Sequence, residues 1–269
     1  MKLSIVGCTG RMGCAVIDEA SKDGSIDISA GFGKYNNQLS GVSFEEISGR
    51  SELKHITTSD NLINVVAASD VVIDFSSPKL SLEVARIVAE QKKALVSGTT
   101  GFSNEDLELL QKHSQNSVIL WSSNMSIGIN LLNILVAKAC TALNSNFDTE
   151  VIEMHHRYKK DSPSGTAITL GKTIAEAKNL DFDKVSRLSR EGIDCERQQD
   201  EIGFATLRGG SVVGDHTVIF ADDNERIELT HKAVNRNIFA AGAIRAAKWA
   251  VQQTPGFYSI KNVIESQLD

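Results

Sequence analysis

Short apolar runs alternate with amphipathic stretches along the first half of the chain. The apolar runs predict strands, and apolar positions spaced three and four residues apart predict helices between them. We expect strands at 3–6, 26–32, 71–75, 94–97 and 118–121, and helices at 12–21, 80–92 and 103–115. Strands separated by single helices are typical of a parallel sheet with helices on both faces. The first half therefore predicts a doubly wound, Rossmann-type α/β domain.

The pattern changes after about residue 126. A long apolar helix is expected at 128–143, then a strand at 149–154 and a helix at 167–178. Three further apolar runs, separated by glycine and Asp/Asn turns, predict an antiparallel meander at 203–207, 211–221 and 226–233. This order predicts a second domain of the α+β kind with a mixed sheet. A last helix at 239–252 is expected to return to the first domain, which gives domains 1–126 with 237–269, and 127–236.

Composition narrows the function classes. The 269 residues are 41% hydrophobic and 23% charged with 3 Pro, as in a globular protein. A net charge of −6 argues against nucleic acid or an anionic membrane as partner, because both need a broad basic face. We find neither an apolar run of the ~18 residues of a spanning helix nor a signal-type cleavage site, and the 4 cysteines have no metal-ligand spacing. We expect a cytoplasmic protein without a metal site.

A glycine-rich loop joins the first predicted strand to the first helix. It reads Gly7-Cys8-Thr9-Gly10-Arg11-Met12-Gly13. Glycines let a backbone approach a pyrophosphate, and a helix N-terminus supplies free N–H groups and partial positive charge. Cys8 stands where the usual dinucleotide fingerprint has its first glycine, so a tight turn without a nucleotide is the alternative.

The end of the second predicted strand bears on the choice of cofactor. NAD-binding proteins usually carry an acidic residue here to hold the adenosine ribose. This chain has Gly33-Lys34, which lacks the acid and brings a cation that tolerates a 2′-phosphate. The alternative is that Lys34 is a solvated loop lysine.

Two more polar segments follow predicted strands of the first domain. They are Gly98-Thr99-Thr100-Gly101 and Ser122-Ser123-Asn124-Met125. Because the carboxyl ends of parallel strands line the ligand crevice of such sheets, we expect both segments to contact a nicotinamide cofactor.

A basic segment follows the first strand of the second domain. Five of the six residues from His155 to Lys160 are cationic or can become so. Ser164-Gly165-Thr166 then opens a helix, and its N–H and hydroxyl groups can hold a carboxylate. Histidine and lysine are credible proton donors at neutral pH. The alternative is a solvated basic loop before an ordinary helix start.

For three other titratable residues of this half, the sequence gives weaker support for a functional role. Glu150 and Glu153 alternate on the predicted strand, so one of them can be simply exposed. His216 lies in the predicted meander, where packing is favoured over a contact with substrate or a neighbouring subunit.

With these residues the sequence closely resembles the dihydrodipicolinate reductase family of lysine biosynthesis. The matching segments are the Gly7–Gly13 loop, Asp74-Phe75-Ser76, Gly98–Gly101, the run from His155 to Thr166, 202–205 and 236–240. The resemblance implies a tetramer with a Rossmann-type domain and a mixed-sheet domain for substrate binding and subunit contacts. It also implies hydride transfer from NADPH or NADH to a cyclic imine that carries two carboxylates, on the diaminopimelate route.

The resemblance further assigns residues to roles. His155 and Lys159 would be the acid/base residues, and His156, Ser164, Gly165 and Thr166 would bind the substrate. The cofactor contacts would be Gly7, Cys8, Thr9, Gly10, Arg11, Met12, Gly98, Thr99, Thr100, Ser122, Ser123, Asn124 and Met125. Several family members have an acidic residue followed by arginine at Gly33-Lys34, so we expect NADPH to serve at least as well as NADH.

Two other functions are compatible with a nucleotide-binding half. An NAD(P)-dependent amino-acid dehydrogenase would share that half but lack the His-His-x-x-Lys pattern at residues 155–159. A nucleotide-sensing regulator without turnover would have lost the acid/base residues. Since His155 and Lys159 are both present, the reductase is the favoured interpretation.

Overall fold

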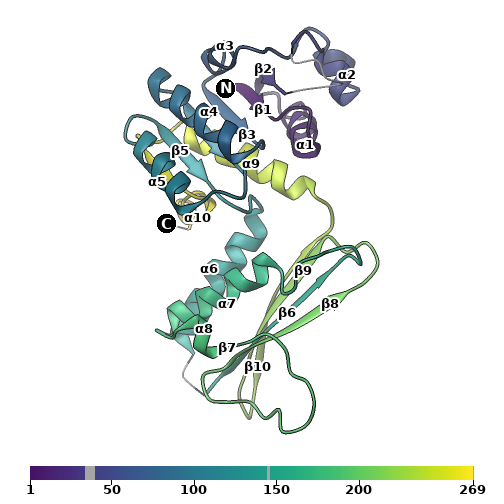
Figure 1. Cartoon of the computed structure of the whole chain (residues 1–269), viewed down its shortest axis with the longest axis vertical. Helices are drawn as coiled ribbons and strands as arrows, with labels where there is room; N and C mark the ends of the chain where they lie inside the picture. Colours follow the sequence, from purple (N-terminus) through teal and green to yellow (C-terminus); the bar gives the residue numbers. More distant parts are fainter. Residues whose placement is uncertain (34–39, 144–145, 269) are drawn as a thin grey trace. The chain divides into compact units, whose positions relative to one another are not determined.

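The computed structural model describes residues 1–33, 40–143 and 146–268. The chain divides into two units, Met1–Ile127 with Asn237–Asp269, and Gly128–Arg236. They are called unit 1 and unit 2 below, and each is described by itself (Figure 1). Lys34 lies outside the described residues.

Unit 1 contains a sheet in the strand order β11-β5-β4-β3-β1-β2, with all pairs parallel. The strands are β1 (Lys2–Val6), β2 (Asp27–Phe32), β3 (Val71–Asp74), β4 (Ala94–Ser97), β5 (Val118–Trp121) and β11 (Gly256–Tyr258). Every residue of β3 and β4 is buried, because helices cover both faces of the sheet. This arrangement confirms the predicted Rossmann-type fold.

The helices of unit 1 form two groups on the sheet. Helices α1 and α9 pack together, and α4 packs with α3 and α5 (Figure 1). They are α1 (Arg11–Ala20), α2 (Phe44–Ser48), α3 (Leu62–Ala67), α4 (Pro78–Gln91), α5 (Asn104–His113), α9 (Asn237–Ala250) and α10 (Ile260–Glu265), with a 3₁₀ turn at Ser51–Leu53. The predicted return of the last long helix to this sheet is confirmed, since α9 packs on β3, β4 and β5.

Unit 2 contains a mixed sheet in the order β10-β9-β6-β8-β7. Its elements are α6 (Ile127–Ala142), β6 (Asp148–His155), α7 (Gly165–Ala177), α8 (Phe182–Val185), β7 (Ser186–Arg187), β8 (Ile202–Arg208), β9 (Gly214–Ala221) and β10 (Arg226–Ala233). The expected meander is wrong for β8, which pairs parallel to β6, whereas β9 pairs antiparallel to β6 and β10. Periodicity located the strands but not their neighbours, because it shows which face a residue occupies and not which strand pairs with it: β6 lies between β8 and β9.

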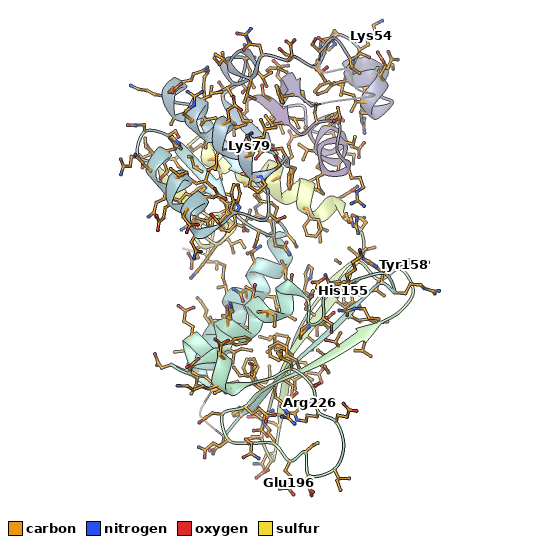
Figure 2. The ribbon with its side chains drawn as sticks, in the orientation of Figure 1. Lys54, Lys79, His155, Tyr158, Glu196 and Arg226 are labelled. Carbon is orange, nitrogen blue, oxygen red and sulfur yellow. The ribbon has the colours of Figure 1, made fainter. Side chains whose placement is uncertain are left out.

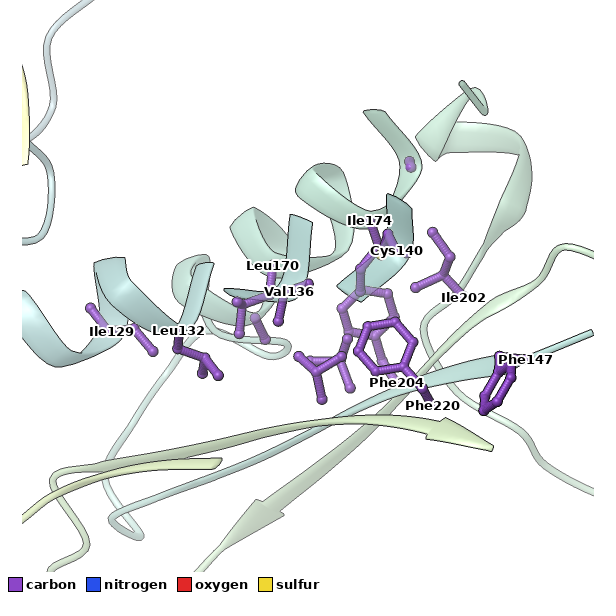
Figure 3. Packing of buried hydrophobic residues seen from close by; sticks show 14 residues of the cluster. Ile129, Leu132, Val136, Cys140, Phe147, Leu170, Ile174, Ile202, Phe204 and Phe220 are labelled. Carbon is purple, nitrogen blue, oxygen red and sulfur yellow. The ribbon is translucent and has the colours of Figure 1, made fainter. Parts of the chain in front are cut away.

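The core of unit 2 lies between one face of this sheet and the helices α6 and α7 (Figure 3). Val151, Phe204, Val218 and Phe220 contribute the sheet side of that core. Along β6 the buried face continues past Val151 to Glu153 and His155, which are also buried. The covered face is therefore apolar along most of its length and polar at the carboxyl end of β6. No helix in the described part of the chain is long and apolar enough to cross a membrane.

Candidate active site

The register of the unit 2 sheet gathers four polar residues at the carboxyl end of β6. His155 is paired with Arg208 on β8, and Glu153 is paired with His216 on β9. Glu153, His155 and His216 are 1%, 8% and 4% exposed. Figure 2 labels His155 in this part of unit 2. Charged and titratable groups buried together at a strand end are typical of a functional site.

The carboxylate of Glu153 is the centre of this cluster. Its Oε2 lies 2.5 Å from Nδ1 of His155 and accepts from Nη1 of Arg208 at 2.9 Å. Its Oε1 accepts from the backbone N–H of Ser164 at 3.0 Å and from Nη2 of Arg208 at 3.0 Å. Both oxygens therefore have two partners each, and the side chain is held from three directions.

The environment sets the charge of these groups. Burial alone would raise the pKa of Glu153, but hydrogen bonds from Arg208 and His155 bring that pKa below its ordinary value. Burial lowers the pKa of His155, an effect that the neighbouring carboxylate of Glu153 opposes. Burial and the nearby His155 lower the pKa of His216 to about 4. At pH 7 the free site thus has an ionised Glu153 and a neutral His216.

Helix α7 begins beside this cluster. Ser164 is its N-cap, and its Oγ accepts from the backbone N–H of Ala167 at 3.1 Å and lies 3.0 Å from Nε2 of His216. Gly165 is exposed, and a Cβ added there would meet no atom within 4 Å. Thr166 follows and is half-buried. The first turn of α7 therefore leaves room for an anion at its positive end.

The loop between β6 and α7 carries the remaining predicted residues. Nζ of Lys159 lies 2.8 Å from Oδ1 of Asp161, and this hydrogen bond lowers the pKa of Asp161. Arg208 donates to the backbone carbonyl of Asp161 at 2.7 Å, which ties the loop to β8. His156 is half-buried, whereas Tyr158 is exposed, as Figure 2 shows. The structure thus brings Lys159 and Ser164 into the neighbourhood of His155.

The predicted phosphate loop in unit 1 needs its glycines. Gly7 has φ +76°, and a Cβ there would lie 2.5 Å from the carbonyl oxygen of Phe75. A Cβ at Gly13 would lie 2.1 Å from the carbonyl oxygen of Gly7. Gly10 is the N-cap of α1 and has no side chain that could cap the helix. The backbone segments of this loop lie close together, and the loop ends at a helix N-terminus without a side-chain cap. Such a loop can bind the pyrophosphate of a dinucleotide.

A second buried carboxylate fixes the neighbouring loops of unit 1. Asp74, at the end of β3, accepts hydrogen bonds from four hydroxyl groups, those of Ser76, Ser81, Ser97 and Thr99, at 2.5–3.0 Å. Burial raises the pKa of Asp74. The Thr99 hydroxyl also accepts from the backbone N–H of Ser76 at 3.0 Å, and Nε1 of Trp121 donates to the Thr99 carbonyl. Asp74 therefore joins the ends of β3 and β4 below the predicted cofactor segment.

The other predicted cofactor residues lie at the same strand ends. Met125 is buried, and Ser122 donates to the carbonyl of Asn124 within a tight turn after β5. Cys8 is fully buried, and burial raises the pKa of its thiol to about 12, so only its backbone is open to a ligand. A Cβ on Gly33 would lie 3.0 Å from Oγ1 of Thr9. The residue after β2 thus packs against the predicted phosphate loop.

Reasoning from the sequence alone missed the roles of three residues in unit 2 and the hydroxyl network of Asp74 in unit 1. The cluster around His155 depends on Glu153 and Arg208, and His216 contacts Ser164 instead of merely packing. Glu153 was detectable, because a period of two puts residues 153 and 155 on one face of a strand. Arg208, His216 and the hydroxyl partners of Asp74 required the register of the sheets.

Comparison with known proteins agrees with this geometry. Family models described as "Dihydrodipicolinate reductase, N-terminus" and "Dihydrodipicolinate reductase, C-terminus" match residues 1–125 and 128–264. Proteins named 4-hydroxy-tetrahydrodipicolinate reductase from Hahella chejuensis and Geotalea uraniireducens are 41% and 40% identical to this chain, over 98% of each chain. The structure of a dipicolinate-bound dihydrodipicolinate reductase from Paenisporosarcina sp. TG-14 aligns with a TM-score of 0.78 at 22% identity, over 97% of this chain and 98% of that one.

Proposed function

The chain belongs to the dihydrodipicolinate reductase family and is an NAD(P)H-dependent 4-hydroxy-tetrahydrodipicolinate reductase, and we propose that the cluster around His155 carries its proton chemistry. The observation that carries the proposal is a buried histidine on an ionised glutamate, beside the open N-terminus of α7. A dicarboxylate needs such an anion site, and the reaction needs a proton donor next to it.

His155 and Lys159 are the acid/base residues of this proposal. NAD(P)H supplies the hydride when it is bound, and the reduced imine, now electron-rich, takes a proton to complete the reduction. His155 donates that proton from Nε2, because its Nδ1 faces Glu153. A bound dicarboxylate adds negative charge beside the imidazole and so favours its protonated form. Lys159 stabilises negative charge on the substrate with its ammonium group.

The remaining residues bind and orient the two ligands. Gly165 and Thr166 hold one substrate carboxylate at the N-terminus of α7, with Ser164 shaping the turn, and His156 contacts the substrate from the loop after β6. The cofactor is held by residues 7–12, 98–100 and 122–125, and by Lys34. With a cation at that position, NADPH serves at least as well as NADH. Unit 1 then acts as the cofactor domain and unit 2 as the substrate domain.

We also propose a homotetramer in the cytoplasm. Unit 2 exposes Leu207, Ile227 and Val234, which are 49%, 37% and 87% exposed. Leu207 pairs with Met154 on the face of the sheet away from the core, where an exposed apolar side chain is available for a subunit contact. Light scattering should give four times the mass of the 269-residue chain, and Leu207→Glu should lower it; a monomeric wild type would contradict this assembly.

The direct test of the proton chemistry mixes the protein, NADPH and the condensation product of pyruvate and aspartate semialdehyde, and follows nicotinamide absorbance. His155→Ala and Lys159→Ala should each lower kcat by about 10²–10⁴-fold, the first through loss of the positioned proton donor and the second through loss of the cation that stabilises the developing charge. Lys160→Ala is the matched control, because Lys160 is an exposed cation of the same loop. If both variants fold and keep near wild-type kcat, the assigned roles are wrong.

A further inference from the structure

We infer that Glu153 is a positioning residue that, held by Arg208, keeps a hydrogen on Nδ1 of His155 and thereby makes Nε2 the atom that exchanges a proton with the substrate. The inference rests on the proposed role of His155 and adds two residues to it. It follows from four contacts of the carboxylate, the register of the sheet and the absence of a hydrogen bond to Nε2 among the described residues.

Four hydrogen-bond partners hold the Glu153 carboxylate in one position. A carboxylate has about four sites at which it accepts hydrogen bonds. Here they face Nη1 and Nη2 of Arg208, the N–H of Ser164 and Nδ1 of His155, at 2.9, 3.0, 3.0 and 2.5 Å. These partners come from β8, the start of α7 and β6 itself. The carboxylate therefore cannot turn away from His155 without losing bonds to two other elements.

The identity of these partners fixes the tautomer of His155. Every other partner of the carboxylate is a donor, and the guanidinium of Arg208 keeps Glu153 ionised by direct pairing. An ionised carboxylate only accepts hydrogen bonds, so the nitrogen of His155 that faces it must carry the hydrogen. Nε2 then carries a lone pair in the neutral imidazole and a hydrogen in the imidazolium. Glu153 thus specifies which nitrogen reacts.

Among the described residues, no group forms a hydrogen bond with Nε2 of His155, whereas Nδ1 faces Glu153. Gly214 on β9 packs beside the ring, and a Cβ added there would lie 2.9 Å from Nε2. The ring of His216 stands edge-on to His155, with centroids 5.1 Å apart, and limits its rotation. The imidazole is therefore held by Glu153 on one nitrogen and left free on the other.

The charges that face His155 come from every strand around it. Glu153 on β6 favours the imidazolium, whereas Arg208 on β8 and Lys159 in the loop after β6 oppose it, and His216 on β9 is neutral at pH 7. Because Arg208 neutralises the charge of Glu153, the dyad orients His155 without making it strongly basic. The carboxylate's role is thus mainly to set the tautomer.

Glu153→Gln tests the inference, and Glu150→Gln is its matched control. Glu150 lies on the same strand and is also paired with arginines, Arg190 and Arg197, but it is on the other face of the sheet. In Glu153→Gln the amide oxygen can still accept from Ser164, so the amide NH₂ then faces Nδ1 and moves the hydrogen to Nε2. We expect kcat to fall by about 10²–10⁴-fold, with KM within about twofold, and the control to keep near wild-type kcat.

A spectroscopic readout separates positioning from general damage. In ¹⁵N NMR spectra, the neutral His155 ring should carry its hydrogen on Nδ1 in the wild type and in Glu150→Gln, and on Nε2 in Glu153→Gln. Dipicolinate affinity, measured by calorimetry, should stay within about threefold in all three proteins. If the unpaired cation of Arg208 unfolds the single variant, Glu153→Gln with Arg208→Gln removes that cation and should lose kcat equally.

The outcomes distinguish the role of Glu153 from the role of His155. A Glu153→Gln protein that keeps wild-type kcat, or whose His155 keeps its hydrogen on Nδ1, overturns the role of Glu153 alone. Full activity in a folded His155→Asn variant overturns the proposed role of His155, and the inference with it.

Discussion

Within the described residues, each unit buries a carboxylate near a strand end, and the two carboxylates have opposite kinds of partner. Asp74 in unit 1 is fully buried and accepts only from neutral hydroxyl groups. Glu153 in unit 2 is 1% exposed and is paired with Arg208 and His155. The pKa of Asp74 is raised by burial, whereas that of Glu153 is lowered in spite of burial. Equal burial thus gives opposite electrostatic outcomes, and the partner decides.

The difference matches what each region has to do. In unit 1 the loops must hold a shape, and hydroxyl groups on Asp74 link two strand ends without introducing a cation. In unit 2 the site must keep one imidazole nitrogen protonated, which requires an ionised acceptor and therefore a cation to hold it ionised. Variants of each carboxylate and of its partners test this contrast.

Replacing Arg208 should destabilise the folded protein, because it leaves the buried charge of Glu153 without its cation. Arg208→Met leaves the Glu153 carboxylate buried beside His155 and the Ser164 N–H. Breaking a buried pair costs ~3–5 kcal/mol, and the 21% exposure of Arg208 favours the lower end. The pKa of Glu153 should then rise, so the loss should grow as pH increases above the ordinary glutamate value. Urea unfolding at pH 5 and 8 measures it.

A surface arginine provides the control for that experiment. Arg226 on β10 pairs with Glu228, and its side chain is 65% exposed. Exposed pairs contribute less than ~1 kcal/mol, so Arg226→Met should change the urea midpoint little at either pH. Equal losses in the two variants would mean that the carboxylate of Glu153 needs no cation.

Asp74→Asn should give the opposite pH dependence. The folded pKa of Asp74 lies above the value of 3.8 for an unperturbed aspartate, so ionisation costs stability that protonation restores. The wild type therefore loses stability as pH rises from 3.8 through the folded pKa, and the amide does not. At pH 4 we expect the variant to be less stable by ~1–3 kcal/mol through lost hydrogen bonds. This deficit should shrink by pH 7; a deficit that grows instead would contradict the raised pKa.

Thr166→Val tests whether a neutral hydroxyl group of unit 2 also binds the substrate carboxylate. The change removes a hydroxyl with little change in shape, at the start of α7 where a carboxylate is proposed to bind. An unpaired carboxylate costs ~1–3 kcal/mol, so KM for the imine should rise about 5–100-fold while KM for NADPH stays constant.

A second threonine on the same helix controls for effects on α7. Thr169 is exposed, and its hydroxyl donates to the backbone carbonyl of Gly165. Thr169→Val should leave both KM values unchanged. A rise in KM for both ligands in Thr166→Val would place the hydroxyl outside the substrate site.

The contrast also separates what the sequence predicts from what it does not. The strands at 94–97 and 118–121 are observed with those bounds, and the helix predicted at 103–115 begins at a capping box of Ser103 and Asp106. Local patterns were sufficient there, because each strand is a continuous apolar run between polar turns. The helix predicted at 239–252 is likewise observed as α9.

The sequence did not predict which strands pair when they lie far apart in the chain. Gly209-Gly210 suggested a hairpin, but β8 and β9 lie on opposite sides of β6. The same register brings Arg208 to Glu153 across 55 positions and His216 to Ser164 across 52. A strand's periodicity states which face a residue occupies and not which strand lies beside it. The individual site residues were therefore predictable, but the network that connects them was not.

The last prediction concerns Gly33-Lys34, where the ribose of the cofactor is proposed to bind and the sequence carries no acidic residue. We expect NADPH to have a kcat/KM at least equal to that of NADH, with an advantage that shrinks as salt screens the phosphate. Gly33→Asp with Lys34→Ser should reverse the preference by a few-fold, because the new carboxylate accepts from the ribose and repels the 2′-phosphate.

The structure sharpens this last prediction. A Cβ at Gly33 would lie 3.0 Å from Oγ1 and 3.2 Å from Cγ2 of Thr9, and 3.1 Å from Sγ of Cys8. The double variant must therefore displace the predicted phosphate loop slightly and raise KM for both cofactors. Adding Thr9→Ala removes two of these three contacts, so it should restore KM for NADH while the reversed preference is kept. A wild type that favours NADH several-fold at low salt would mean that Lys34 makes no phosphate contact, and that unit 1 selects its cofactor without using charge.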